Sequence, residues 1–256
     1  MATSHKAQRA EGCNALQQAL VQELRSFAVP LLIAPDLELR PNEVRNATGV
    51  FLRVGTRQCL VTCYHVWKEL DAERRDHVPS VMVALLADGS GAFHIERPTL
   101  LTKADKLRLA EELDLAIFDV TGTKLFGEKR CFPFTEASVH NPIRGDIVVT
   151  IGFPGMWRKS EKNYTCVASG PLPFTVSDVS SRSFIVQEND PHNQEVFAYL
   201  DAQQRGHNSG DACGGLSGAP AFYVNQKPFK IAGFIIQRAL GCVMLARASS
   251  LKELME

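Results

Sequence analysis

Residues 47–66 read ATGVFLRVGTRQCLVTCYHV. Two segments rich in apolar and β-branched residues flank a turn at Gly55, a pattern that predicts two neighbouring strands of a sheet. His65 comes directly after the second of these segments. Of the seven histidines in the chain, it is the only one at the end of a clear hydrophobic strand. We therefore favour a functional role for His65 over that of a core histidine.

Two further segments supply the partners that a reactive histidine needs. Residues 113–120 read LDLAIFDV, with Asp114 directly before an apolar strand, and residues 215–220 read GLSGAP, with Ser217 between glycines. A serine hydroxyl is a poor nucleophile at neutral pH, a histidine can accept its proton, and a carboxylate can hold the second ring N–H. Each residue also has an ordinary explanation, as a strand end, a strand entry or a turn. Their order along the chain favours a catalytic triad of His65, Asp114 and Ser217.

These segments resemble the motifs of trypsin-like, chymotrypsin-fold serine proteases, in which an LVTAxHV strand, a DLAxx strand and a GxSGxP turn follow one another. Residues 145–154, GDIVVTIGFP, resemble the strand that opens the second barrel of that family, and the resemblance covers about residues 43–250. It implies an all-β fold of two six-stranded antiparallel β-barrels with an N-terminal helical extension and a short C-terminal helix. No cofactor and no metal site are expected.

The expected domain organisation has three parts. Residues 1–42 form an N-terminal helix and a connector, in which residues 6–27 are amphipathic and Pro30 belongs to the extended connector. Residues 43–125 form the first barrel with His65 and Asp114. Residues 126–256 form the second barrel with Ser217 and the C-terminal helix. Two polar stretches, 155–165 and 187–211, are expected to be loops beside the cleft.

The resemblance also implies roles for residues around Ser217. The backbone N–H groups of Gly215 and Ser217 would form the oxyanion hole. A substrate peptide would pair with the strand containing Ile235, Ile236 and Gln237. Asp211, six residues before Ser217, would lie in the primary pocket and select Arg or Lys before the cleaved bond. Leu216 stands where related zymogens have the acid that receives a freed N-terminus, so activation by that route is not expected.

The seven cysteines leave one alternative open. Cys59 and Cys63 lie on a predicted strand with Cα atoms roughly 13 Å apart, too far for a disulfide. Cys213 and Cys242 occupy positions that resemble a family disulfide, and whether they are bonded stays open. Cys213, in the run DACGG, is an alternative nucleophile of the cysteine-protease type. A second alternative is a pseudoprotease that binds peptides without cutting them.

Composition excludes some classes of function. The chain has 256 residues, a formal net charge of zero and an isoelectric point of about 7.0. Nothing in this balance points to nucleic acid or to an anionic membrane, and no apolar run is long enough to span a bilayer. Residues 1–14 lack the apolar core of a signal peptide, so a cytoplasmic location is expected. The expected partners are a protein or peptide substrate and a regulator or activating protease that acts on the N-terminal helix.

Overall fold

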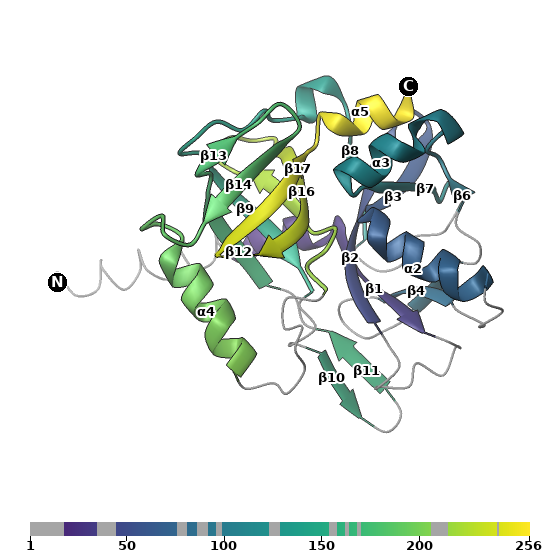
Figure 1. Ribbon diagram of the computed structural model, residues 1–256, viewed down its shortest axis with the longest axis horizontal. Helices are drawn as coiled ribbons and strands as arrows, with labels where there is room; N and C mark the ends of the chain where they lie inside the picture. The colour runs from purple at the N-terminus through teal and green to yellow at the C-terminus, as the bar shows by residue number, and fades with distance from the viewer. Residues whose placement is uncertain are drawn as a thin grey trace.

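Two curled antiparallel sheets dominate the protein, with short helices around them (Figure 1). The computed structural model describes residues 18–34, 45–75, 81–85, 92–95, 99–122, 129–153, 158–161, 164–167, 170–205, 215–239 and 241–256. The expected fold of chymotrypsin type is confirmed, but each predicted six-stranded barrel is a curled sheet, or half-barrel, with eight strands in the first and seven in the second among the described residues.

The first sheet contains the predicted hairpin of residues 47–66. Its strands follow the order β5-β4-β1-β2-β3-β7-β6, and β8 pairs with β2. Gly55, at φ 59°, occupies the turn between β2 and β3 as predicted. The strand bounds are β1 Ala28–Ala34, β2 Arg45–Val54, β3 Arg57–Thr62, β4 Val81–Leu85, β5 Ala92–Ile95, β6 Thr99–Leu100, β7 Ala116–Asp119 and β8 Phe132–Pro133.

The expected connector is in part a strand. β1 pairs with both β2 and β4, and Pro30 lies within it, opposite Thr48. Proline lacks an N–H, so its position predicted a break, but β1 tolerates it and its residues from Ala28 to Ile33 are buried. The first sheet also includes β8, so strands outside the expected limits 43 and 125 pair with β2.

The second sheet follows the order β12-β9-β15-β16-β17-β14-β13, and β10 and β11 form a separate hairpin. That hairpin occupies much of the stretch 155–165, which was expected to be a loop. The strand bounds are β9 Ile147–Gly152, β10 Arg158–Glu161, β11 Tyr164–Val167, β12 Gly170–Thr175, β13 Asp178–Val179, β14 Ser183–Gln187, β15 Pro220–Tyr223, β16 Lys230–Ala239 and β17 Cys242–Arg247.

Helices cover the edges of the two sheets (Figure 1). The expected C-terminal helix is present, whereas α4 lies in a stretch that was expected to be a loop. Phe197 of α4 is fully buried and packs against Phe174 of β12, which explains why this polar segment is helical. The described helices are residues 18–25, α2 Tyr64–Arg75, α3 Leu107–Leu113, α4 Gln194–Arg205 and α5 Ser250–Met255, with short 3₁₀ turns η1 Ala104–Lys106 and η2 Glu136–Ser138.

One apolar cluster joins the two sheets. Phe27, which follows the helix at 18–25, contacts Phe132 of β8 at 5.2 Å and Phe222 of β15 at 6.1 Å between ring centroids. Leu24 is fully buried in the same cluster. The described end of the N-terminal segment is therefore part of the core. None of the helices described is both long and apolar enough to cross a membrane.

Candidate active site

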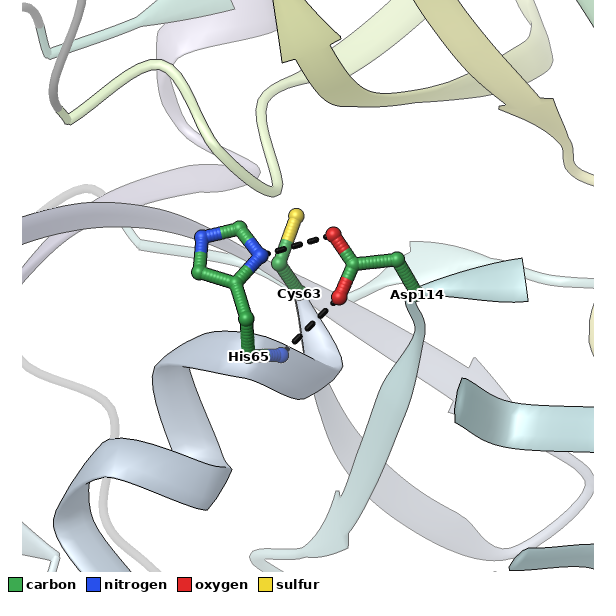
Figure 2. A group of neighbouring side chains, drawn as sticks. All are labelled: Cys63, His65 and Asp114. Carbon is green, nitrogen blue, oxygen red and sulfur yellow. Dashed lines mark hydrogen bonds and ion pairs between the residues drawn. The ribbon is translucent and has the colours of Figure 1, made fainter. Parts of the chain in front are cut away.

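His65 lies in the first turn of α2, just beyond the end of β3 (Figure 2). The sequence placed it at the end of a strand, and the helix begins one residue earlier, at Tyr64. Its side chain is 46% exposed. A strand followed at once by a helix puts the imidazole at the surface on a rigid base, where a ligand can reach it.

Asp114 makes two hydrogen bonds with His65 and a third with the preceding residue, Tyr64. The Asp114 Oδ2 atom is 2.7 Å from His65 Nδ1, and Oδ1 accepts the His65 backbone N–H at 2.9 Å. The Asp114 carbonyl accepts the Tyr64 N–H at 3.1 Å. The first N–H groups of a helix have no partner within the helix. Asp114 therefore caps α2 and orients the imidazole with the same carboxylate.

The backbone of Asp114 is bent to make this possible. It ends α3 as the C-cap residue with φ 50° and ψ 44°, in the left-handed region. Asp and Asn enter this region more readily than other non-glycine residues. The turn reverses the chain from α3 into β7, which runs beside β3. Asp114 is therefore both the end of α3 and the entry to β7, and these two structural roles position its carboxylate.

Ser217 lies on a tight turn, as expected. The Ala219 N–H donates to the Leu216 carbonyl at 2.8 Å, and Gly218, at φ 87°, takes the position where the turn needs a positive φ. The Gly218 N–H donates to the Ile235 carbonyl of β16 at 2.8 Å. A Cβ at Gly218 would lie 2.2 Å from the Thr48 carbonyl oxygen, so only glycine fits this turn.

Thr48 connects the serine turn to the first sheet, and sequence reasoning missed it. Its backbone N–H donates to the Ser217 carbonyl at 2.9 Å, and its hydroxyl donates to the Gly215 carbonyl at 2.5 Å. The same hydroxyl accepts the Phe153 N–H at 3.1 Å. Thr48 is fully buried. A lone threonine within an apolar strand was the available signal, because a buried hydroxyl needs partners.

Cys63 lies between the His65 and Asp114 side chains in Figure 2, and it is fully buried. Its sulfur contacts the Ile235 carbonyl at 3.3 Å. Burial raises the pKa of the Cys63 thiol well above its usual range, and Asp114 raises it further, while the Gly218 N–H and the Ser217 hydroxyl act against this increase. The Ser217 side chain is thus a neighbour of Cys63, and Cys63 is a neighbour of the His65–Asp114 pair. All four residues lie at one place.

The positions next to Ser217 differ in what surrounds them. Gly215 is buried with φ 103°, a value that favours glycine. Leu216 is 3% exposed and belongs to the apolar cluster of the second sheet. A Cβ on Gly152 of β9 would approach the Leu216 side chain to 2.4 Å. Leu216 therefore anchors the turn by apolar packing, where an acidic side chain would need a cation.

The strand expected to bind substrate has one open edge. β15 pairs with β16 only as far as Phe234, whereas β17 pairs with β16 from Gly233 to Ala239. The register shifts between Ile235 and Gln237, so Ile236 lies at a bulge. Ile235 is buried and Gln237 is exposed. Within the described residues, no strand covers residues 236–239 on the β15 side, which leaves backbone groups for an added strand.

Two expected residues, Asp211 and Cys213, lie outside the described residues. The primary-pocket role of Asp211 and the nucleophile role of Cys213 therefore stay predictions. Cys242 is a free cysteine whose thiol donates to the Ala239 carbonyl at 3.0 Å. Cys59 and Cys63 are free as well, as their predicted separation on a strand requires.

Comparisons with known proteins agree with this architecture. The family model of the trypsin-like peptidase domain matches residues 47–227, which include the histidine, aspartate and serine segments. No curated protein matches the chain. Because the family model covers more than half of its length, the chain belongs to the trypsin-like peptidase domain family.

Two solved protease structures resemble the chain at low sequence identity. The protease Anisep from Arthrobacter nicotinovorans has a TM-score of 0.50 and 10% identity over 87% of this chain and 90% of that one. The thermostable serine protease AL20 from an extremophilic microorganism has a TM-score of 0.48 and 14% identity over 90% of this chain and 95% of that one. The likeness to Anisep supports the chymotrypsin-type fold.

Proposed function

We propose that this trypsin-like peptidase is a serine endopeptidase that hydrolyses peptide bonds with His65, Asp114 and Ser217. The observation that supports this most is the double hold of the Asp114 carboxylate on the His65 backbone and ring. Such a hold fixes both the ring orientation and the tautomer with the proton on Nδ1. It assigns the exchange of a proton with Ser217 to Nε2, the ring nitrogen that does not face Asp114.

The reaction would proceed in two halves. Ser217 Oγ attacks the carbonyl carbon while His65 accepts its proton, and His65 then gives that proton to the leaving amine. Water repeats the sequence on the acyl-enzyme and releases the acid. The N–H groups of Gly215 and Ser217 would bind the oxyanion, and each such donor contributes about a hundredfold or more to turnover. Thr48 supports this turn through the carbonyl groups of the same two residues.

The test of the nucleophile is labelling with a fluorophosphonate probe, followed by mapping of the modified residue. We expect modification of Ser217 in the wild-type protein and none in Ser217→Ala. A Cys213→Ala variant is the matched control for the cysteine-protease alternative, and it should keep its labelling. A fully active Ser217→Ala protein would refute the proposal, and a folded wild-type protein that neither reacts nor cleaves would favour the peptide-binding pseudoprotease.

For specificity, we propose cleavage after Arg or Lys, with Asp211 as the selecting residue. A desolvated carboxylate in the pocket would pair with a cationic side chain and would be left unpaired by a neutral one. Reporter peptides with Arg, Lys, Ala or Glu before the cleaved bond test this. We expect kcat/KM to be at least about tenfold higher for Arg and Lys, and Asp211→Asn to remove most of that difference. Equal cleavage after Glu would exclude the role of Asp211.

Regulation through the N-terminal segment can be tested by a deletion that ends before the buried residues begin. Residues 24, 27 and 28–34 are part of the core and of the first sheet, so removal of residues 1–41 would expose the cluster around Phe27. Deletion of residues 1–17 removes none of these core residues. A rise in peptidase activity after this deletion would support an autoinhibitory role for the segment, and an unchanged activity would argue against it.

A further inference from the structure

Three different metal-binding side chains meet at the candidate active site. Cys63 Sγ, a ring nitrogen of His65 and a carboxylate oxygen of Asp114 all lie within 4.8 Å of one another. Figure 2 shows the Cys63 side chain between the imidazole and the carboxylate. The ligands come from the residue after β3, the first turn of α2 and the end of α3. The spacing of these residues in the sequence does not indicate a metal site, and none was expected.

The donor atoms suit a thiophilic divalent cation. Zn²⁺ binds sulfur at about 2.3 Å and imidazole nitrogen or carboxylate oxygen at about 2.0–2.2 Å, in a tetrahedron. Neighbouring ligand atoms are then about 3.3–3.6 Å apart. The three ligand atoms, which now lie within 4.8 Å of one another, would move slightly closer together. The 2.7 Å distance between His65 Nδ1 and Asp114 Oδ2 would lengthen. Mg²⁺ and Ca²⁺ prefer oxygen ligands and fit poorly, because only one carboxylate is present.

The exposure of His65 and Asp114 gives the cation a route from solvent to the site. The His65 and Asp114 side chains are 46% and 24% exposed, whereas Cys63 is fully buried. A cation from solvent therefore meets the imidazole and the carboxylate first and the sulfur last. Solvent would supply the fourth ligand, since three protein ligands leave one tetrahedral position.

We propose that Cys63, His65 and Asp114 bind Zn²⁺ or a similar thiophilic cation, and that this cation reversibly inhibits the peptidase. On binding, the Cys63 S–H proton leaves to solvent and a Zn–S bond forms. The His65 proton moves from Nδ1 to Nε2, so that the ring stays neutral while Nδ1 coordinates. The thiolate and the carboxylate then balance the two charges of the cation.

Inhibition follows from the atoms that the cation occupies. Nδ1 of His65 then binds the cation and no longer donates a hydrogen bond to Asp114. Because Nε2 carries the ring proton, the ring cannot accept a proton from Ser217. Only this inhibitory consequence rests on the proposed function, because binding itself needs no catalysis. The cation would thus compete with the hydrogen bond that the reaction requires.

The test measures binding and activity separately on the full-length protein. Calorimetric titration with Zn²⁺ and the ultraviolet absorption of a Cd²⁺–thiolate bond report binding, and a reporter peptide gives the ratio of activity with and without Zn²⁺. Variants Cys63→Ala and Cys63→Ser remove the sulfur, and the serine variant keeps the side-chain size if the alanine variant fails to fold. Cys59→Ala is the matched control, since Cys59 is a second buried, free thiol on the neighbouring β3 strand.

We expect Zn²⁺ to bind wild-type protein and Cys59→Ala alike, and both Cys63 variants at least about tenfold more weakly. The difference in Cd²⁺ absorption between wild type and the Cys63 variants should equal one thiolate ligand. Equal Zn²⁺ binding by wild type and the Cys63 variants would overturn the site. Cys63-dependent binding without any effect on measurable activity would overturn the inhibition. A wild-type protein that binds Zn²⁺ through Cys63 yet never cleaves peptides would refute the proposed function and keep the metal site.

Discussion

Two histidine–aspartate pairs among the described residues have almost the same local construction, and we propose a catalytic role for only one of them. His65 Nδ1 lies 2.7 Å from Asp114, and His140 Nε2 lies 2.7 Å from Asp146. In both pairs the carboxylate also accepts a backbone N–H, from His65 in the first and from Ile143 in the second. A short contact between imidazole and carboxylate is therefore not by itself evidence of an active site.

What differs is the surroundings of the two rings. The His140 ring stacks on Tyr223 at 3.8 Å between centroids, and its side chain and that of Asp146 are 19% and 13% exposed. The His65 side chain is 46% exposed and has the Cys63 sulfur nearby, and Cys63 in turn neighbours the Ser217 side chain. The His140 pair links Asp146, the residue before β9, to the ring that stacks on Tyr223 of β15, whereas the His65 pair is open to solvent. We infer that exposure and the nearby serine turn distinguish the proposed catalytic pair from the other one, and the following changes test this difference.

The largest effect on kcat should come from Asp114, and the matched change at Asp146 should have almost none. Asp114→Asn keeps an oxygen to cap α2 but presents an NH₂ group to the imidazole, which favours the wrong tautomer. We expect kcat to fall about 10³- to 10⁴-fold with the fold retained. Asp146→Asn should leave kcat within about threefold and lower the melting temperature by a few degrees. Steady-state kinetics and thermal unfolding of both variants check this, and equal losses of kcat would remove the distinction between the pairs.

Thr48→Val tests how much the Ser217 turn depends on its attachment to the first sheet, separately from the contact between His65 and Asp114. It leaves the Gly215 carbonyl and the Phe153 N–H without their hydroxyl partner. We expect a loss of about 2–3 kcal/mol in unfolding free energy and of about 10- to 100-fold in kcat/KM. Thr150→Val is the matched control, because the buried Thr150 hydroxyl bonds only the Leu172 carbonyl among described partners. If both variants lost activity equally, Thr48 would have no special role in holding the serine turn.

Alkaline pH should lower the stability of the protein through Cys59 of β3, the strand that precedes His65. Burial, with a smaller contribution from Asp119, raises the pKa of the Cys59 thiol to about 11, from 9.0. The stability that the neutral thiol contributes is complete below pH 9 and is lost as the pH rises toward 11, because the unfolded thiol ionises first. Urea unfolding at pH 8 and pH 10.5 should show about 1–2 kcal/mol more loss in wild type than in Cys59→Ala. Identical losses would contradict this.

The smallest effect should come from Tyr223→Leu, which removes the stacking partner of His140. Stacked aromatic pairs contribute about 0.5–1.5 kcal/mol beyond their buried area. We expect a loss of that order in unfolding free energy and an unchanged kcat. A double variant with Asp146→Asn would show whether stacking and hydrogen bonding stabilise His140 independently. A large loss of kcat in Tyr223→Leu would mean that His140 takes part in catalysis.

Local patterns predicted much of this protein. The hairpin at Gly55, the strand after Asp114 and the tight turn at Ser217 all appear where they were expected, because strand periodicity and turn chemistry act over a few residues. Strand β1 was missed, since Pro30 looks like a break when the neighbours that cover it are unknown. Helix α4 was missed as well, because the burial of Phe197 against Phe174 outweighs its polar sequence.

By itself, the sequence determined the order of His65, Asp114 and Ser217 and the fold class to which that order belongs. Tertiary structure alone decided that the Asp114 carboxylate caps α2 while it orients His65, that Thr48 ties the serine turn to the other sheet, and that Cys63 lies beside the pair. These contacts join residues from 49 to 169 positions apart for Asp114 and Thr48. Hydrogen bonds and burial depend on distance in space, and a sequence read along its length does not contain that distance.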